Sequence, residues 1–358
     1  MIRSTSPSRH WIAARTLVLA VIGGFAINSL GIPLGWLLGS MLASMTATVA
    51  KVETSAPAWV RVPTLAILGA MLGSTFSPST IGVAGGWMSS MAVMVGAEIA
   101  MSALVVWYFQ RVSGYDPATA YFSGICGVIA QSTACAFTAG ADVPKVAISH
   151  GFRIVLLLLI VPPLAMKLAG ISAPAVAAAT SGSAVTLEPG LLLALAALCT
   201  AGVLLGKITR IPSPHMLGPM ALFAVLHLSG VYDGAPPRWL TDAALVGLGV
   251  VIGSRFAGVT GGSLIGMVRT TLPGFVVLCL GLAAATGLMT WITGFPVALS
   301  LLILTPSGVA EMALVALSCG IDPATVAIHH AIRIALTLPA VPILFECRRY
   351  FASRTPSA

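Results

Sequence analysis

Apolar runs separated by short breaks rich in Gly, Pro or polar residues fill nearly the whole chain. The runs are long enough for membrane helices and recur from one end to the other, in two sets of six. They cover roughly residues 12–31, 34–50, 60–77, 86–110, 117–138 and 143–168, and then 188–206, 214–230, 238–256, 270–292, 297–319 and 323–347. This pattern predicts an all-α polytopic membrane protein.

The two sets of runs are copies of one unit. Residues 114–163 align without a gap on the segment that begins at 294, at a constant offset of 180 that pairs Gly140 with Gly320 and Arg153 with Arg333. Earlier segments align at an offset of 179 or 180, which one single-residue indel explains. The duplication predicts a first membrane repeat at 1–170, a flexible Ala-, Ser- and Gly-rich linker at 171–187, and a second membrane repeat at 188–358.

The positions of Lys and Arg distinguish parallel from inverted repeats. Arg153 and Arg333 fall within apolar runs, which leaves 16 of the 18 basic residues to be counted. If all six runs of each half cross the membrane, the residues divide 11 to 5; if the fifth run enters and returns on one side, they divide 14 to 2. The second division favours inverted repeats of about five transmembrane helices, each with one broken or re-entrant helix. It also predicts both termini on the cytoplasmic side of the membrane.

Composition limits the partners. Of the 358 residues, 58% are hydrophobic and 8% are charged, too few polar side chains to cover a soluble globule, so the lipid bilayer is the expected partner. The net charge of +8 comes from Lys and Arg residues scattered singly, which disfavours nucleic acid. Short segments and Gly-rich faces are compatible with a homodimer. No phosphate-binding loop and no Cys or His spacing typical of a metal site is present, so no cofactor is expected.

The fifth run of each half contains a break at the same place. Residues 124–127 read Gly-Ile-Cys-Gly, and residues 305–308 read Thr-Pro-Ser-Gly. Glycine and proline weaken a continuous helix, and non-helical backbone at membrane depth is tolerated only in a protein-lined or wet cavity. Broken helices at corresponding positions of two halves indicate a transport site, with Ser307 as a ligand contact. For the first break, a packing contact between helices is a comparable interpretation.

Acidic residues within the apolar runs are candidate ion ligands, because each is costly in lipid unless it is paired or hydrated. Glu311 follows the second break by one helical turn, and Gln131 occupies the same place in the first half. This asymmetry is expected of a site that binds one cation or one proton. The alternative is a structural ion pair between Glu311 and Arg333 or Arg153. Glu98 is a second buried acid, either a proton carrier or a protonated packing residue.

Arg153 and Arg333 occupy equivalent positions in the last run of each half, each three residues after a histidine, His150 or His330. Side chains at i and i+3 share a helix face. Two guanidinium groups near the centre would suit a planar anion held by two hydrogen bonds, although each is near enough to a helix end to reach water. The histidines could relay protons or form hydrogen bonds between helices.

The duplicated motifs resemble the AbrB-type bacterial membrane-protein family. The resemblance covers nearly the whole chain and is carried by the segment Pro-His-x-Leu-Gly-Pro at 214–219, by Pro-Ser-Gly-x-x-Glu at 306–311 and by His-His-x-x-Arg at 329–333. It implies two inherited labels, ammonia monooxygenase and regulator of gene expression. Neither label comes with an agreed set of functional residues.

These observations favour a secondary transporter of a small anionic or amphoteric solute coupled to H⁺ or Na⁺. We expect Glu311 to bind the coupling ion, Ser307 to contact the ligand, and Arg333 with Arg153 to bind substrate charge or pair with Glu311. One alternative is a membrane sensor that affects gene expression indirectly, because no extramembrane segment is long enough for a DNA-binding module. A monooxygenase is disfavoured, since the six histidines form neither an H-x-x-x-H nor an E-x-x-H pattern.

Overall fold

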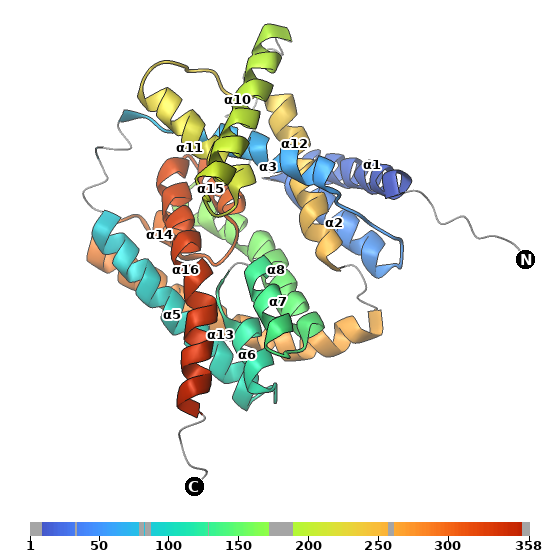
Figure 1. Ribbon diagram of the computed structural model, residues 1–358, viewed down its shortest axis with the longest axis vertical. Helices are drawn as coiled ribbons and strands as arrows, with labels where there is room; N and C mark the ends of the chain where they lie inside the picture. The colour runs from blue at the N-terminus through green and yellow to red at the C-terminus, as the bar shows by residue number, and fades with distance from the viewer. Residues whose placement is uncertain are drawn as a thin grey trace, which may run out of the picture. The chain divides into compact units, whose positions relative to one another are not determined.

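The computed structural model describes residues 9–32, 34–78, 82, 87–127, 129–171, 189–256 and 261–352. Within these residues the chain is helical and forms no strand (Figure 1). The predicted all-α class is therefore confirmed. Almost all of the predicted linker lies outside the described residues.

The helices follow the predicted apolar runs closely. The first half contains α1 (Arg9–Asn28), α2 (Gly35–Val49), α3 (Ala58–Gly73), α5 (Trp87–Arg111), α6 (Pro117–Gly124), α7 (Ile129–Thr138) and α8 (Val143–Ala169). The second contains α10 (Pro189–Ile208), α11 (Pro214–Leu228), α12 (Arg238–Gly253) with the 3₁₀ turn η2 (Ser254–Phe256), α13 (Gly261–Thr293), α14 (Val297–Leu304), α15 (Val309–Ser318) and α16 (Pro323–Ala352). The largest difference is at α13, which begins nine residues before the predicted run.

Seven of the described helices are long and apolar enough to cross a membrane. They are α1, α5, α8, α10, α12 extended to Phe256, α13 and α16. Three further helices that we expected to cross, α2, α3 and α11, have only 15 or 16 residues and extend about 22–24 Å, less than the roughly 30 Å of a hydrocarbon core. The chain is a polytopic membrane protein, and ten crossings stay a prediction.

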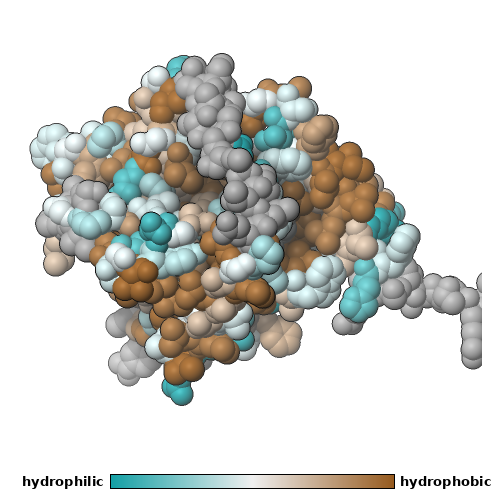
Figure 2. Space-filling view, turned by 90° about the horizontal axis from the view of Figure 1, so that it is seen from above, coloured by the Kyte–Doolittle hydropathy of each residue, from teal (hydrophilic) through white to brown (hydrophobic). Residues whose placement is uncertain are grey.

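Large hydrophobic side chains are exposed on many helices, as lipid contact requires. Examples are Trp11, Phe25, Leu193 and Trp291, which are 62–80% exposed. Figure 2 shows hydrophobic side chains over wide parts of one face of the molecule. In water a patch of this extent would be a site of aggregation, whereas in a bilayer it is covered by acyl chains.

Contacts divide the chain into two compact units, and each unit takes segments from both halves of the sequence. Unit 1 comprises Met1–Ile81, Leu158–Leu264 and Ala313–Ala324, and unit 2 comprises Gly82–Leu157, Ile265–Met312 and Thr325–Ala358. In unit 1, α2 packs on α1 and α12, while α11 packs on α10 and α3. Each second helix of a half therefore packs on the third helix of the other half.

Glycines at equivalent positions allow these helices to approach closely. A Cβ atom at Gly73 of α3 would collide with the carbonyl oxygen of Met220 in α11, and one at Gly253 of α12 would lie 2.7 Å from the carbonyl oxygen of Met41 in α2. Small residues four apart permit such backbone contact between membrane helices. The same contact is therefore made twice in unit 1, by residues that the duplication pairs.

Unit 2 contains both breaks and the residues predicted for the site. Its aromatic core joins α6 to α16: the rings of Phe122 and Phe345 are 4.7 Å apart, and the Tyr121 hydroxyl donates to the carbonyl oxygen of Val341 at 2.8 Å. Val146 of α8 and Ala136 of α7 complete this buried cluster. The core fixes the first broken helix against the last helix of the chain.

Candidate functional site

The first break separates α6 from α7. Asp116 caps the start of α6 by accepting hydrogen bonds from the amides of Ala118 and Thr119, and Pro117 follows at the first helical position. The helix ends after Gly124, because Ile125 adopts an extended conformation with φ −65° and ψ 137°. At Gly124 a Cβ atom would lie 2.6 Å from the backbone nitrogen of Val106, so α6 and α5 are in backbone contact there.

The second break separates α14 from α15 at the place that the duplication predicts. Thr305 ends α14 in an extended conformation, φ −60° and ψ 120°, as expected for a residue before a proline. Pro306, Ser307 and Gly308 then carry the chain to the start of α15 at Val309. Both breaks leave carbonyl oxygens at the end of a helix inside the protein, and these oxygens need donors.

His150 and Arg153 of α8 supply the donors for the first break. The His150 Nε2–H group donates to the carbonyl oxygen of Phe122 at 2.8 Å, and Arg153 Nη1 donates to that of Ile125 at 3.1 Å. A cation at the carboxyl end of a helix is also favoured by the helix dipole. Both side chains are buried, and together they stabilise the open end of α6.

His330 and Arg333 of α16 repeat the arrangement at the second break. His330 Nε2–H donates to the carbonyl oxygen of Leu302 at 2.9 Å, and Arg333 Nη1 donates to that of Thr305 at 2.8 Å. The residue number of each donor and acceptor differs by 180 from that of its counterpart at the first break. Arg333 Nη2 also donates to the carbonyl oxygen of Ser307, so the second break is held at two points.

The partners define the protonation of both histidines. Because a carbonyl oxygen only accepts, Nε2 carries the hydrogen in each ring, and because a guanidinium only donates, each Nδ1 accepts. Arg153 Nη2 donates to His150 Nδ1 at 2.8 Å, and Arg333 Nη2 donates to His330 Nδ1 at 3.0 Å. Both rings are therefore neutral in this arrangement and act as caps. The predicted proton relay would require one ring to leave its carbonyl or its arginine.

Glu98 of α5 lies near Arg153 and Arg333, the two arginines that cap the breaks. Its side chain is only 8% exposed, and within the described part of the chain its Oε1 atom has no hydrogen-bond partner. The positive charges of Arg333 and Arg153 are close enough to attract a carboxylate at this position. A buried carboxylate with an unused acceptor is costly in an apolar protein unless it is protonated or binds a ligand.

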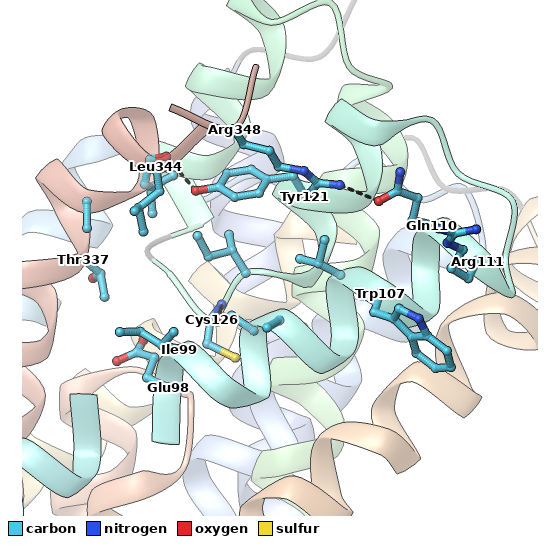
Figure 3. Close-up of a pocket in the computed structure, with 16 residues that line it drawn as sticks. Glu98, Ile99, Trp107, Gln110, Arg111, Tyr121, Cys126, Thr337, Leu344 and Arg348 are labelled. Atoms are coloured by element: carbon cyan, nitrogen blue, oxygen red, sulfur yellow. Dashed lines mark hydrogen bonds between the residues drawn. The ribbon is translucent and has the colours of Figure 1, made fainter. Parts of the chain in front are cut away.

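Glu98 lines a partly open cavity of about 570 Å³ between α5, the first break and α16 (Figure 3). Ser102, one turn further along α5, accepts a hydrogen bond from the backbone amide of Cys126 at 2.9 Å, which holds the extended backbone of the break against the cavity wall. At the other end, Arg348 of α16 donates to the side-chain oxygen of Gln110. Most of the wall is apolar, as in typical small-molecule sites.

The other predicted ligands lie at the amino ends of the second half-helices. Glu311 is 6% exposed in the first turn of α15, and the hydroxyl oxygen of the preceding Ser307 is buried without a hydrogen-bond partner among the described residues. Gln131 lies in the corresponding turn of α7, where its amide nitrogen is 3.5 Å from Cys135 Sγ. These three residues are absent from the described lining of the Glu98 cavity. The structure thus brings Arg333 to Ser307, and places Glu98 in a separate pocket.

His329, which the sequence analysis did not select, forms a second buried hydrogen-bond chain. Its Nδ1–H donates to the carbonyl oxygen of Thr325 at 2.8 Å, and its Nε2 is 2.7 Å from the hydroxyl of Ser90 in α5. The ring of Trp87 packs edge-on against it at 6.1 Å. Only the adjacent His330 could have drawn attention to this residue, because Ser90 lies 239 positions away.

Comparison with known proteins identifies the family of this chain. A family model described as transition state regulatory protein AbrB matches residues 36–349. The chain belongs to the AbrB family. It is 26% identical to protein YhjN of Bacillus subtilis (strain 168), over 92% of this chain and 91% of that one. It is 27% identical to a protein of Escherichia coli (strain K12) whose name gives it as a regulator, AbrB, over 67% of this chain and 68% of that one.

The oxygenase label attached to the AbrB family would call for copper or iron. In the ranges that the structure describes, no three His, Cys, Asp or Glu side chains are grouped so that they could hold a metal ion. The described residues therefore do not fit such a centre.

Proposed function

We propose that this AbrB-family membrane protein is a secondary transporter of the bacterial inner membrane, with both termini cytoplasmic. Its two repeats, 1–170 and 188–358, would be inverted copies joined by the linker at 171–187. The solute is small and anionic or amphoteric, and its movement is coupled to H⁺ or Na⁺. The observation that carries the proposal is the pair of half-helix ends, each capped inside the protein by a His–Arg pair at equivalent positions.

The two breaks support different roles because their neighbours differ. The second break offers the Glu311 carboxylate and the unused Ser307 hydroxyl beside non-helical backbone, a set of oxygen atoms suited to a small cation or a proton. The first break lies on the cavity that contains Glu98, which has room for an organic solute. Arg153 and Arg333 then act by fixing the half-helices at the two breaks.

Counterflow in proteoliposomes tests the proposal. Vesicles loaded with an unlabelled panel of amino acids and short carboxylates should concentrate a labelled member of the panel, because a carrier exchanges one for the other. Glu311→Gln should abolish uptake driven by an imposed proton or sodium gradient, since the amide cannot bind and release the ion, and should leave folding intact. The matched control Glu53→Gln removes an exposed carboxylate and should transport normally.

Two results would contradict this account. Gradient-driven uptake of normal rate by Glu311→Gln would remove Glu311 from the coupling site. Binding of a panel member without counterflow would favour a membrane sensor instead, the function that the regulatory names of the family model and of the Escherichia coli relative suggest.

A further inference from the structure

Faces of α5 and α16 form most of the wall of the Glu98 cavity, and the two ends of the cavity offer different hydrogen-bonding groups. On α5, the lining residues Glu98, Ser102, Val106 and Gln110 are spaced by four and so form one stripe. On α16, the lining residues run from Thr337 to Arg348, the latter opposite Gln110. The close-up in Figure 3 shows Glu98 beside Thr337 at one end and the Arg348–Gln110 pair at the other.

The Glu98 end offers hydrogen-bond acceptors. Oε1 of Glu98 is unpartnered within the described chain, and an ionised carboxylate can only accept. The Thr337 hydroxyl donates to the carbonyl oxygen of Arg333 at 2.9 Å, so towards the cavity it presents only its oxygen lone pairs. A bound group that satisfies both must carry several donors, and a positive charge would stabilise the buried carboxylate. A protonated amine has both properties.

The Arg348 end offers donors. The side-chain oxygen of Gln110 accepts from Arg348, which leaves the Gln110 amide hydrogens and the remaining guanidinium hydrogens for a ligand. Arg111 also lines this end of the cavity. Two guanidinium groups and an amide favour a carboxylate.

The length and lining of the cavity restrict the solute further. Glu98 and Gln110 are twelve residues apart on α5, about 18 Å along the helix axis. Because the Glu98 and Arg348 side chains are long, the distance between their charged groups is shorter, about the length of a short peptide. The wall between the ends is formed mainly by aliphatic side chains and Trp107. A lipid acyl chain would suit this wall but would leave the buried oxygen of Glu98 without a partner.

We propose that this cavity binds an extended amphoteric solute, with an ammonium group at Glu98, a carboxylate at Arg348 and Gln110, and an apolar body between them. A short apolar peptide has this chemistry. The inference rests on the proposed transport function and narrows its solute class from anionic or amphoteric to amphoteric with separated charges.

The test is equilibrium binding of tri-leucine to the purified full-length protein in lipid nanodiscs. Tri-leucine should bind, and its N-acetyl and C-terminal amide derivatives should each bind about tenfold or more weakly, because each loses one charge-assisted contact. Glu98→Gln should weaken tri-leucine to the level of the N-acetyl derivative and remove the difference between them. Arg348→Gln should do the same for the amide, and Glu53→Gln should change nothing.

The outcomes separate this inference from the proposed function. Equal binding of tri-leucine and its N-acetyl derivative, or unchanged binding by Glu98→Gln, would overturn the amine site even if counterflow of another solute is found. Free leucine binding as tightly as tri-leucine would overturn the two-ended site. Charge-dependent binding without counterflow would support the site and contradict transport. If Glu98→Gln does not fold, the derivatives still test the site on the unaltered protein.

Discussion

The two broken helices have the same His–Arg caps but differ in the acidic residues around them. In both, a histidine and an arginine three residues later cap carbonyl oxygens of the first half-helix, at positions related by the offset of 180. Near these caps, the first half has Glu98 where the second has Leu278, and the second has Glu311 where the first has Gln131. Each copy has therefore kept its cap and one acid, at different places. This division is what a carrier needs if one copy contacts the solute and the other the ion.

Removing the arginine caps is expected to have the largest effect on stability. Arg333 reaches two carbonyl oxygens and Arg153 one, apart from a long contact with Cys126 Sγ at 4.0 Å. We expect Arg153→Met to lower the free energy of unfolding by about 2 kcal/mol and Arg333→Met by about 3 kcal/mol or more, because hydrogen bonds from a charged donor contribute roughly 1.5–3 kcal/mol each. Thermal unfolding in detergent measures both.

Arg269→Met is the control for these variants, since Arg269 is exposed. It should change stability by less than about 0.5 kcal/mol. If the three variants were equally stable, the carbonyl oxygens would be satisfied in another way and the capping account would be wrong.

Much of this arrangement could be predicted from sequence, because the patterns involved are local. The apolar runs place the helices, and Gly or Pro at equivalent positions places both breaks. The spacing of His150 and Arg153 predicts that they share a helix face. Their acceptors could not be predicted, since Phe122 and Ile125 lie 28 residues earlier and offer backbone oxygens, which leave no signature in the side-chain sequence.

The cavity was beyond sequence analysis for a related reason. Glu98 was recognisable as a buried acid, but the Gln110–Arg348 pair joins residues 238 positions apart. Nothing in the apolar pattern of α5 or α16 indicates which faces meet. Packing of side chains from three segments creates the cavity, and that packing depends on the tertiary fold.

The glycines that end the two breaks provide a test of intermediate size. At Gly308 a Cβ atom would collide with the carboxylate of Glu311, whereas at Gly127 the nearest atom is Val341 Cγ2 at 3.1 Å. Gly308→Ala should displace the carboxylate and reduce gradient-driven uptake by about tenfold or more, as expected when a functional group moves by about 1 Å. Gly127→Ala should retain most of the uptake. Similar losses of uptake in both variants would mean that the added methyl group acts by disturbing the backbone of the break. The position of the Glu311 carboxylate would then not explain the loss.

The smallest expected difference is at the starts of the two capping helices. Asp142 accepts from the Lys145 amide at 3.1 Å and pairs with its ammonium at 2.9 Å, while Asp322 accepts from the Ala324 amide at 3.1 Å. Partial burial raises the pKa of Asp142, but the hydrogen bonds and charge of Lys145 outweigh it and hold that pKa below the ordinary value of 3.8.

A carboxyl group whose pKa is depressed by folding stabilises the protein above its unfolded pKa, and that contribution is lost as the pH falls through the folded value. The stability advantage of the unaltered protein over Asp142→Asn should therefore be constant near neutral pH and shrink below about pH 3.8. It should stay under about 1 kcal/mol, because the pair is exposed to solvent. Chemical unfolding in detergent between pH 3 and 6 measures this difference. An advantage that did not change with pH would show that the charge of Asp142 does not cause it. The ion pair with Lys145 would then not distinguish the first copy from the second.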